Sequence, residues 1–328
     1  MGCLSIKPYM SFHIVSIDAP SCSLSCRDGQ LTCRTDDGER RLPLEDVAAV
    51  IITSFNASIH SHLFLEAAKH GVALIICEAF KPVSLLLPAN RSTDTLLSRA
   101  VLDLAPRVRE ALWRRTVDAK CHNQVTLAAF IAPHDDGLPD LRQAALSRHP
   151  HKESTCARCY WRVLGRALGR EDFRRVPGEA SGLNALLNYG YAVLLSTVLQ
   201  KLFAVGLDPT WGLSHAPRER ATPLAYDLME PFRPCVDWRV WQWTRRHPDP
   251  ATWQVTKEYR GWVTGFALER VEHLEFTLEA RGVIEGVVRS FRRAVMENAV
   301  RPYRPWQPGP GRWPPREGQP QTDPNEHE

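Results

Sequence analysis

The sequence predicts an α+β protein of two domains, a small N-terminal β-sheet domain followed by an all-α C-terminal domain. The chain has 328 residues, which is more than a single hydrophobic core usually organises. Short β-rich runs separated by turn signals fill residues 1–92, whereas long segments with helical spacing fill residues 93–304. Residues 305–328 hold seven prolines and no apolar periodicity, so we expect a disordered tail there.

The N-terminal domain is expected to be a compact β domain with one small helix. Asp28-Gly29 is a strong signal for a two-residue hairpin turn, and residues 36–38 make the next turn. The short helix is expected around residues 64–70. The predicted strands are residues 13–17, 21–27, 30–35, 48–53, 72–77 and 83–87.

Three long helices are predicted in the C-terminal domain, where apolar residues recur at helical spacing. They cover residues 96–117, 183–203 and 271–299. The longest uninterrupted apolar stretches, such as residues 72–77, are too short to span a bilayer, so we expect no membrane association. Nine cysteines without an export signal predict reduced thiols in a cytoplasmic protein.

Charge is distributed unevenly along the chain. The formal net charge is +4, from 41 Lys and Arg against 37 Asp and Glu. Residues 91–304 carry 32 basic and 24 acidic side chains, whereas residues 1–90 carry 7 and 9 and residues 305–328 carry 2 and 4. The predicted helical domain is therefore the part that would hold a polyanion.

Glu153 lies near the start of a segment with helical spacing. On a helix, Glu153, Ala157 and Tyr160 share one face, and the small alanine leaves room beside the carboxylate. A basic stripe runs one step around the same helix and consists of Arg158, Arg162, Arg166 and Arg170. Such a stripe is either a solvated face or, beside a functional carboxylate, a track for phosphates.

A second group of ionisable residues lies further along the chain. His215 precedes Pro217 and Pro223, which predicts a loop, while Asp227 and Glu230 are three residues apart on one side of a helical turn. One imidazole with two or three carboxylates suits Mg²⁺ or Mn²⁺. Such an ion can polarise a phosphodiester and orient an attacking hydroxyl. The spacing alone is equally compatible with a surface helix beside a lone histidine.

A zinc site is the competing interpretation, built from His149, His151, Cys156 and Cys159. His151-x-Glu153 imitates the opening of a deaminase signature, which also needs Pro-Cys-x-x-Cys well downstream. Here the first cysteine follows Glu153 by only three residues and lacks the preceding proline. Both cysteines also fall within a predicted helix, which argues against the zinc interpretation.

Several motifs follow one another in a specific order along almost the whole predicted folded chain. They are Trp113…Val117-Asp-Ala-Lys120-Cys-His-Asn123-Gln124, Glu153…Ala157-Arg-Cys-Tyr-Trp, Asn184-Ala-Leu-Leu-Asn188-Tyr-Gly190-Tyr191, Gly206-Leu-Asp-Pro209, Gly212-Leu-Ser-His215 and Asp227-Leu-Met-Glu230-Pro-Phe-Arg233-Pro…Asp237. This series resembles the CRISPR-associated integrase and endonuclease family, the universal adaptation enzyme of CRISPR systems. The resemblance implies a β-rich dimerisation domain at residues 1–92 and a metal-dependent catalytic domain at residues 93–304.

The resemblance also implies a set of site residues. The family's metal triad carries over onto Glu153, His215 and Glu230, and Asp227 matches a further acidic ligand or support. The expected cofactor is Mg²⁺ or Mn²⁺.

Four further residues are candidates for contact with nucleic acid. Arg158 and Arg162 of the basic stripe are candidate phosphate-binding residues. Tyr191 and Tyr226 either stack on a base near the site or pack in the core.

The implied reaction is a metal-dependent transesterification on DNA. The 3′-hydroxyl of a captured double-stranded fragment, the prespacer, attacks a phosphodiester at the leader-end CRISPR repeat. One phosphodiester replaces another, and consistently the sequence has no Gly-x-x-x-x-Gly-Lys-[Ser/Thr] loop for a nucleoside triphosphate. The implied partners are a second protomer and the small second adaptation subunit. A structure-specific nuclease for branched DNA and a catalytically silent DNA-binding scaffold are the alternatives.

Overall fold

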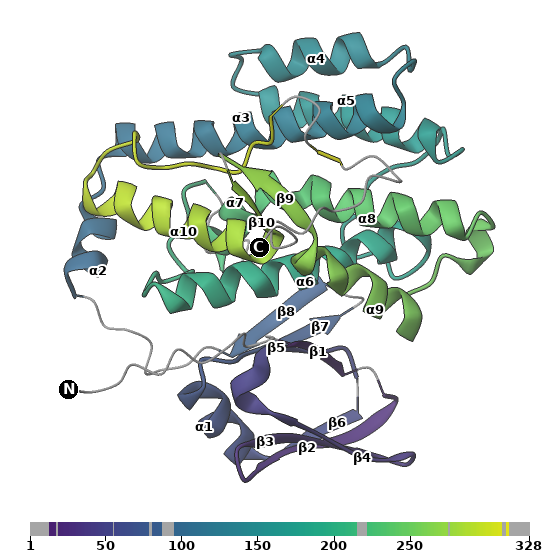
Figure 1. Ribbon diagram of the computed structural model, residues 1–328, viewed down its shortest axis with the longest axis vertical. Coiled ribbons are helices and arrows are strands. Elements are labelled where there is room, and N and C mark those ends of the chain that lie inside the picture. Colours follow the sequence, from purple (N-terminus) through teal and green to yellow (C-terminus); the bar gives the residue numbers. More distant parts are fainter. Residues whose placement is uncertain are drawn as a thin grey trace, which may run out of the picture.

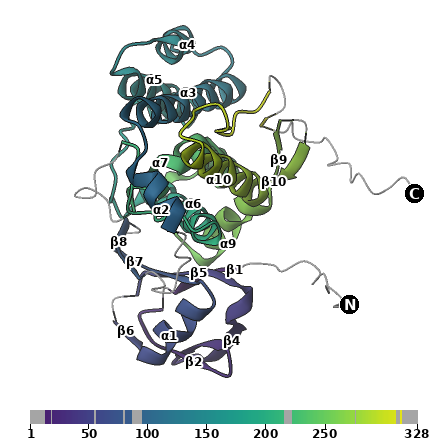
Figure 2. The same ribbon diagram turned by 90° about the vertical axis from the view of Figure 1, so that its left-hand side faces the viewer.

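The computed structural model describes residues 13–17, 19–54, 56–78, 81–86, 95–214, 222–274, 276–309 and 313–314. It confirms the α+β class, because the N-terminal part is built mainly of strands and the C-terminal part of helices (Figure 1). The view turned by 90° shows the N-terminal sheets below the helices (Figure 2). The domain boundary that we expect after residue 92 lies outside the described residues and stays a prediction.

The N-terminal domain contains two four-stranded sheets. Its elements are β1 (His13–Ile17), β2 (Ser21–Arg27), β3 (Gln30–Thr35), β4 (Gly38–Pro43), η1 (Leu44–Asp46), β5 (Val47–Ile52), β6 (Asn56–Ile59), α1 (Ser61–Lys69), β7 (Ala73–Glu78) and β8 (Lys81–Leu86). One sheet has the order β1-β5-β7-β8, with only β8 antiparallel to its neighbour. The other has the order β4-β3-β2-β6, with only the pair β2–β6 parallel.

Alternating burial explains why the predicted strands form. In β2, Cys22, Leu24 and Cys26 are buried, and the residues between them are not. The predicted hairpin turn is confirmed, since Asp28 and Gly29 both adopt positive φ, at 53° and 72°. Strands β4 and β6 were not predicted, because these edge strands carry mostly exposed side chains and lack an apolar pattern.

The sheet β1-β5-β7-β8 separates two hydrophobic cores. Val50 and Leu74 pack with the second sheet and α1, whereas Ile51 and Ile75 pack with the helical domain. Successive side chains of a strand point to opposite faces, so β5 and β7 are buried on both sides. Helix α6 (Gly182–Ala204) covers the face that is turned toward the helices (Figure 1).

The C-terminal domain is mainly helical. Its helices are α2 (Thr95–Leu102), α3 (Pro106–Ile131), α4 (Leu138–Leu146), α5 (Lys152–Ala167), α6 (Gly182–Ala204), α7 (Pro223–Met229), η2 (Glu230–Phe232), α8 (Arg233–Arg246), η3 (Pro250–Thr252), α9 (Lys257–Thr264), η4 (Gly265–Leu268) and α10 (Ala280–Met296). By length and composition α6 could cross a membrane, but 94% of its apolar window is buried inside the protein. Core packing therefore accounts for its apolar composition.

Two of the three long helices predicted for this domain need correction. The segment 96–117 is interrupted, because α2 ends at Leu102 and α3 begins at Pro106, and proline suits the first turn of a helix rather than its interior. The segment 271–299 begins with a hairpin of β9 (Arg270–His273) and β10 (Phe276–Glu279). The domain is therefore not entirely α-helical. The third helix, α6, is confirmed.

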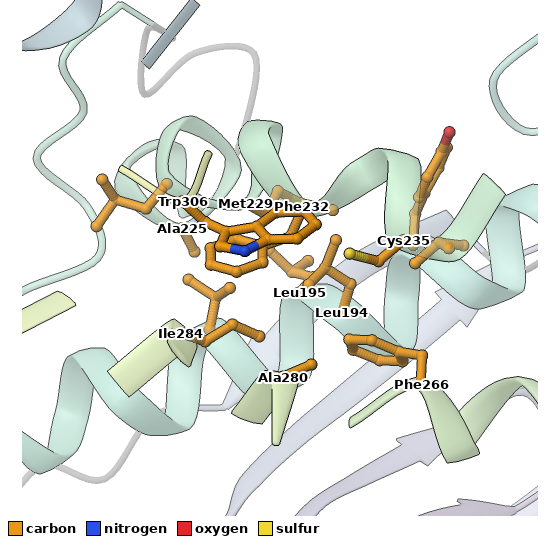
Figure 3. Close-up of a cluster of buried hydrophobic side chains, with 14 of the residues drawn as sticks. Leu194, Leu195, Ala225, Met229, Phe232, Cys235, Phe266, Ala280, Ile284 and Trp306 are labelled. Carbon is orange, nitrogen blue, oxygen red and sulfur yellow. The ribbon is translucent and has the colours of Figure 1, made fainter. Parts of the chain in front are cut away.

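The first part of the predicted disordered tail packs into the core. Trp306 and Trp313 are buried, and the ring of Trp306 stacks on Phe232 with the centroids 5.4 Å apart. Figure 3 shows Trp306 beside Met229 in this cluster. The tail prediction is wrong for this part, because two tryptophans bury large apolar surfaces despite the surrounding prolines. Residues 315–328 lie outside the described residues.

Candidate active site

Helices α3 and α5 pack together and carry the centre of the candidate site (Figure 1). Glu153 lies in the first turn of α5, as predicted. Lys120 projects from α3, and its Nζ lies 2.6 Å from Glu153 Oε1. One turn further along α5, Cys156 is buried against the same part of α3, where its Sγ lies 3.5 Å from Gln124 Oε1. This packing holds Glu153 at a partly exposed edge.

Lys120 joins the two predicted carboxylate ligands. Its Nζ also lies 2.6 Å from Glu230 Oε2, so one ammonium contacts a carboxylate oxygen of each glutamate. Lys120 is 8% exposed and Glu230 is 2% exposed. Burial alone lowers the pKa of Lys120, but the carboxylates of Glu230 and Glu153 outweigh it and raise that pKa. The structure thus brings Glu153 and Glu230 together around one cation.

A second cation fixes the other side of Glu230. Arg233 Nε lies 2.9 Å from Glu230 Oε1. The 3-10 helix η2 begins at Glu230, and α8 begins directly after it at Arg233. The two side chains are therefore three residues apart on one turn. Burial lowers the pKa of Arg233, but the Glu230 carboxylate outweighs this effect and raises it. Each carboxylate oxygen of Glu230 therefore faces a positive charge.

Asp227 is buried and binds the loop that precedes His215. Its Oδ2 accepts hydrogen bonds from the backbone N–H groups of Leu213 and Ser214. Arg109 holds the same loop by donating to two of its carbonyl oxygens. His215 itself lies outside the described residues. The observed contacts give Asp227 a role in positioning this loop, and its role as a ligand stays a prediction.

A buried network that the sequence analysis did not predict lies beside Arg233. Asp237 accepts hydrogen bonds from the hydroxyls of Tyr160, at 2.7 Å, and Tyr191. The guanidinium of Arg233 lies 4.6 Å from the centroid of the Tyr191 ring. Burial raises the pKa of Asp237 to about 6, although both hydroxyls and Arg233 act to lower it. The available signal was the i,i+4 spacing of Arg233 and Asp237 on α8.

The two candidate base-stacking tyrosines have different surroundings. Tyr191 is 7% exposed and donates to Asp237, but it also lines the pocket that Tyr226 lines, so its contact with a base stays a prediction. Tyr226 is half-buried. It lines a pocket of about 140 Å³ together with Lys120 and Ala157. The sequence predicted open space beside Glu153, next to the small side chain of Ala157. That space is part of this pocket, which lies next to the paired carboxylates.

The basic stripe on α5 divides into two parts. Arg158 and Arg162 are exposed and line a shallow pocket between α4 and α5 together with Lys152. Arg166 instead makes two hydrogen bonds to the carboxylate of Asp135, at 2.8 and 2.5 Å. Arg158 and Arg162 are therefore open to a ligand, whereas Arg166 fixes α5 to the loop before α4.

The zinc interpretation fails for the described residues. Cys156 is fully buried and contacts Gln124, while His149 and His151 are exposed and their ring centroids lie 5.2 Å apart. In the described part of the chain, no group of three His, Cys, Asp or Glu side chains is arranged to hold a metal ion. The helical turn of α5 directs Cys156 into the core, away from the histidines.

The paired carboxylates do fit a hard divalent cation. Glu153 Oε1 and Glu230 Oε2 both reach one ammonium, so both could reach one metal ion between them. Carboxylate oxygens are the ligands that Mg²⁺ and Mn²⁺ prefer. The third predicted ligand, His215, would complete the set from the loop that Asp227 binds.

Comparisons with known proteins show which family the chain belongs to. A family model described as CRISPR associated protein Cas1 matches residues 15–263. The CRISPR-associated endonuclease Cas1 of Neisseria meningitidis serogroup C (strain 8013) is 31% identical over 226 residues, which cover 66% of this chain and 71% of that protein.

Two solved structures have a similar fold. A casposase bound to integration product has a TM-score of 0.71 at 20% identity, covering 87% of this chain and 90% of that one. A Cas6-RT-Cas1–Cas2 complex has a TM-score of 0.73 at 13% identity, covering 92% of this chain and 37% of that one. From the family match and the relative together, the chain belongs to the Cas1 family of CRISPR-associated endonucleases.

Proposed function

We propose that this protein is a CRISPR adaptation integrase, which inserts captured DNA fragments as new spacers at a CRISPR repeat. The observation that carries the proposal is the convergence of Glu153 and Glu230 on one cation. This pair lies within the part of the chain that carries its excess of basic residues. Acidic metal ligands surrounded by basic side chains suit the transfer of phosphodiester bonds in DNA.

Glu153, His215 and Glu230 are the residues that we expect to hold Mg²⁺ or Mn²⁺. The bound ion supplies stabilisation of charge on the phosphate and orientation of the attacking 3′-hydroxyl. The protein's part is to fix the ligands, since Arg233 holds Glu230 and Asp227 holds the loop before His215. Because one phosphodiester replaces another, the reaction needs no nucleoside triphosphate.

The proposed substrates are double-stranded prespacer DNA with 3′ ends and CRISPR repeat DNA. Arg158 and Arg162 are exposed on α5, whose first turn carries Glu153. They are our candidates for contact with the phosphate backbone. Tyr191 and Tyr226 both line the pocket beside Lys120 and are our candidates for contact with a base.

The proposed partners are a second protomer and the small second adaptation subunit. The structurally similar complex named Cas6-RT-Cas1–Cas2 supports the second partner, since its name joins a Cas1 to a Cas2. The casposase named as bound to integration product supports a DNA integration reaction. The N-terminal β domain is our candidate for the surface that binds the second protomer.

A half-site integration assay with titrated Mg²⁺ and Mn²⁺, with and without the small subunit, tests this function. Glu153→Gln and Glu230→Gln should each abolish strand transfer and leave DNA binding largely intact, because the carboxylates act after binding. Glu258→Gln is the matched control, since Glu258 is an exposed glutamate on α9. Near-normal strand transfer by either site variant would contradict the proposal.

The same assay separates the two alternatives. Metal-dependent cleavage of branched DNA without any strand transfer would indicate a structure-specific nuclease. DNA binding with neither metal-dependent reaction would indicate a silent scaffold. Chelation by EDTA should stop strand transfer by the wild type, and added Mn²⁺ should restore it.

A further inference from the structure

Lys120 occupies the point at which the two carboxylates of the site converge. We propose that its ammonium is a built-in counter-cation, which holds Glu153 and Glu230 together without metal and must leave when a divalent ion binds. This inference rests on the proposed function, because it takes Glu153 and Glu230 as metal ligands. It adds a competition between a side chain of this protein and its metal.

The burial of the site explains why a counter-cation is needed. Glu230 is 2% exposed, and a buried carboxylate without a partner is costly. Its Oε2 and Glu153 Oε1 are both 2.6 Å from the same nitrogen, so they lie no more than twice that distance apart. Without a cation between them, the two carboxylates would repel each other across a poorly solvated space.

The contact geometry explains why the ammonium must leave. Arg233 already faces Glu230 Oε1, so Oε2 is the oxygen that Lys120 and a metal would share. An ion bound to both glutamates would lie about 2.1 Å from each oxygen. It would need the same two carboxylate oxygens that Lys120 Nζ now contacts, so the ammonium and the ion would compete for them.

The structure offers the displaced ammonium a place nearby. Lys120 lines the pocket of about 140 Å³ together with Gln124, Ala157 and Tyr226. The flexible four-carbon stem of lysine allows its head group to turn into this space. Arg233 also lines the pocket, so metal binding would concentrate positive charge at the wall where a DNA phosphate would approach.

Calorimetric titration of the full-length, DNA-free protein with Mn²⁺ tests the competition at one fixed pH. Lys120→Met removes the ammonium and should bind Mn²⁺ about tenfold more tightly than wild type, because a like charge has left the site. Lys120→Arg should bind Mn²⁺ more weakly than wild type, since guanidinium forms stronger paired hydrogen bonds with carboxylates. Lys120→Arg keeps the charge and so decides the question if Lys120→Met does not fold.

Lys201→Met is the matched control. Lys201 Nζ lies 3.1 Å from Glu285 Oε2 and joins α6 to α10, outside the paired glutamates. Its loss should leave Mn²⁺ affinity unchanged. The opposite variants of Lys120 and this control together separate a local competition from a general change of charge.

The outcomes also separate this inference from the proposed function. If wild type binds Mn²⁺ and Glu153→Gln does not, but Lys120→Met and Lys120→Arg bind like wild type, the counter-cation role is overturned and the metal site stands. If neither wild type nor the Lys120 variants bind Mn²⁺, both ideas are overturned.

Discussion

The two domains of this protein handle charge in different ways. In the N-terminal domain, ion pairs join residues close in sequence and near the surface, as where Glu39 binds Arg34 and Arg41. In the helical domain, Lys120 and Glu230 come from distant parts of the chain and are both buried. Exposed pairs contribute little to stability, whereas buried charges depend on each other. The difference indicates that the helical domain tolerates a costly polar centre at its site.

The largest expected effect follows from removing the C-terminal segment that packs against this centre. Asn123 of α3 donates to the backbone carbonyls of Pro231 and Trp306, so this segment helps to hold the turn that carries Glu230. Ending the chain at Arg304 removes the buried side chains of Trp306 and Trp313 and should lower the free energy of unfolding by about 5 kcal/mol. Urea denaturation followed by tryptophan fluorescence and circular dichroism measures it.

A chain that ends at Pro314 is the control for this truncation, because it keeps Trp306 and Trp313. We expect it to unfold like the full chain. Equal stability of the chain ending at Arg304 and the full chain would show that the helical domain does not depend on this segment.

The next effect concerns the buried carboxylate of Asp227. Asp227→Ala leaves the N–H groups of Leu213 and Ser214 without their acceptor, so we expect a loss of about 2–3 kcal/mol in unfolding free energy. Strand transfer should also fall, because the loop before His215 loses its anchor. Asp36→Ala, at an exposed turn of the N-terminal domain, should change neither quantity. If Asp227→Ala were as stable as wild type, the stability of the helical domain would not depend on this buried carboxylate.

A smaller effect is expected from the pH dependence of Asp237. Its pKa is about 6 in the folded protein, against an ordinary value of 3.8. The folded state therefore binds this proton more tightly, and stability should fall as pH rises from about 4 to about 6. Between pH 5 and 7.5, wild type should lose about 1–2 kcal/mol more than Asp237→Asn. Parallel pH profiles of unfolding free energy for the two proteins would contradict this assignment.

The parts of the fold that the sequence could predict are rich in buried apolar side chains. Strand β2 buries alternate side chains, helix α6 buries nearly all of its side chains, and both were predicted. The edge strand β4 is charged and mostly exposed, so it carries no such pattern. The predicted helix began at residue 271 because apolar residues precede α10, although β9 and β10 form a hairpin there.

The site was predictable only in part, for a related reason. Glu153, Asp227 and Glu230 were identified by local spacing and by the order of the motifs. Lys120 and Asp237 belong to the same motifs, but no role was predicted for them, because their partners lie on other helices. Contacts between distant parts of a chain arise from packing, which spacing along the sequence does not encode.

The smallest expected effect on stability belongs to the exposed arginines of α5. Arg158→Ala and Arg162→Ala remove side chains at the surface, so the free energy of unfolding should stay within error of wild type. If each arginine contacts a DNA phosphate, the slope of log affinity against log salt should become shallower by about 1 per variant. Arg34→Ala is the control, since Arg34 is an exposed arginine of the N-terminal domain. An unchanged slope for both α5 variants would leave this stripe as a solvated helix face. It would then be the buried cations, and not the exposed ones, that distinguish the helical domain from its neighbour.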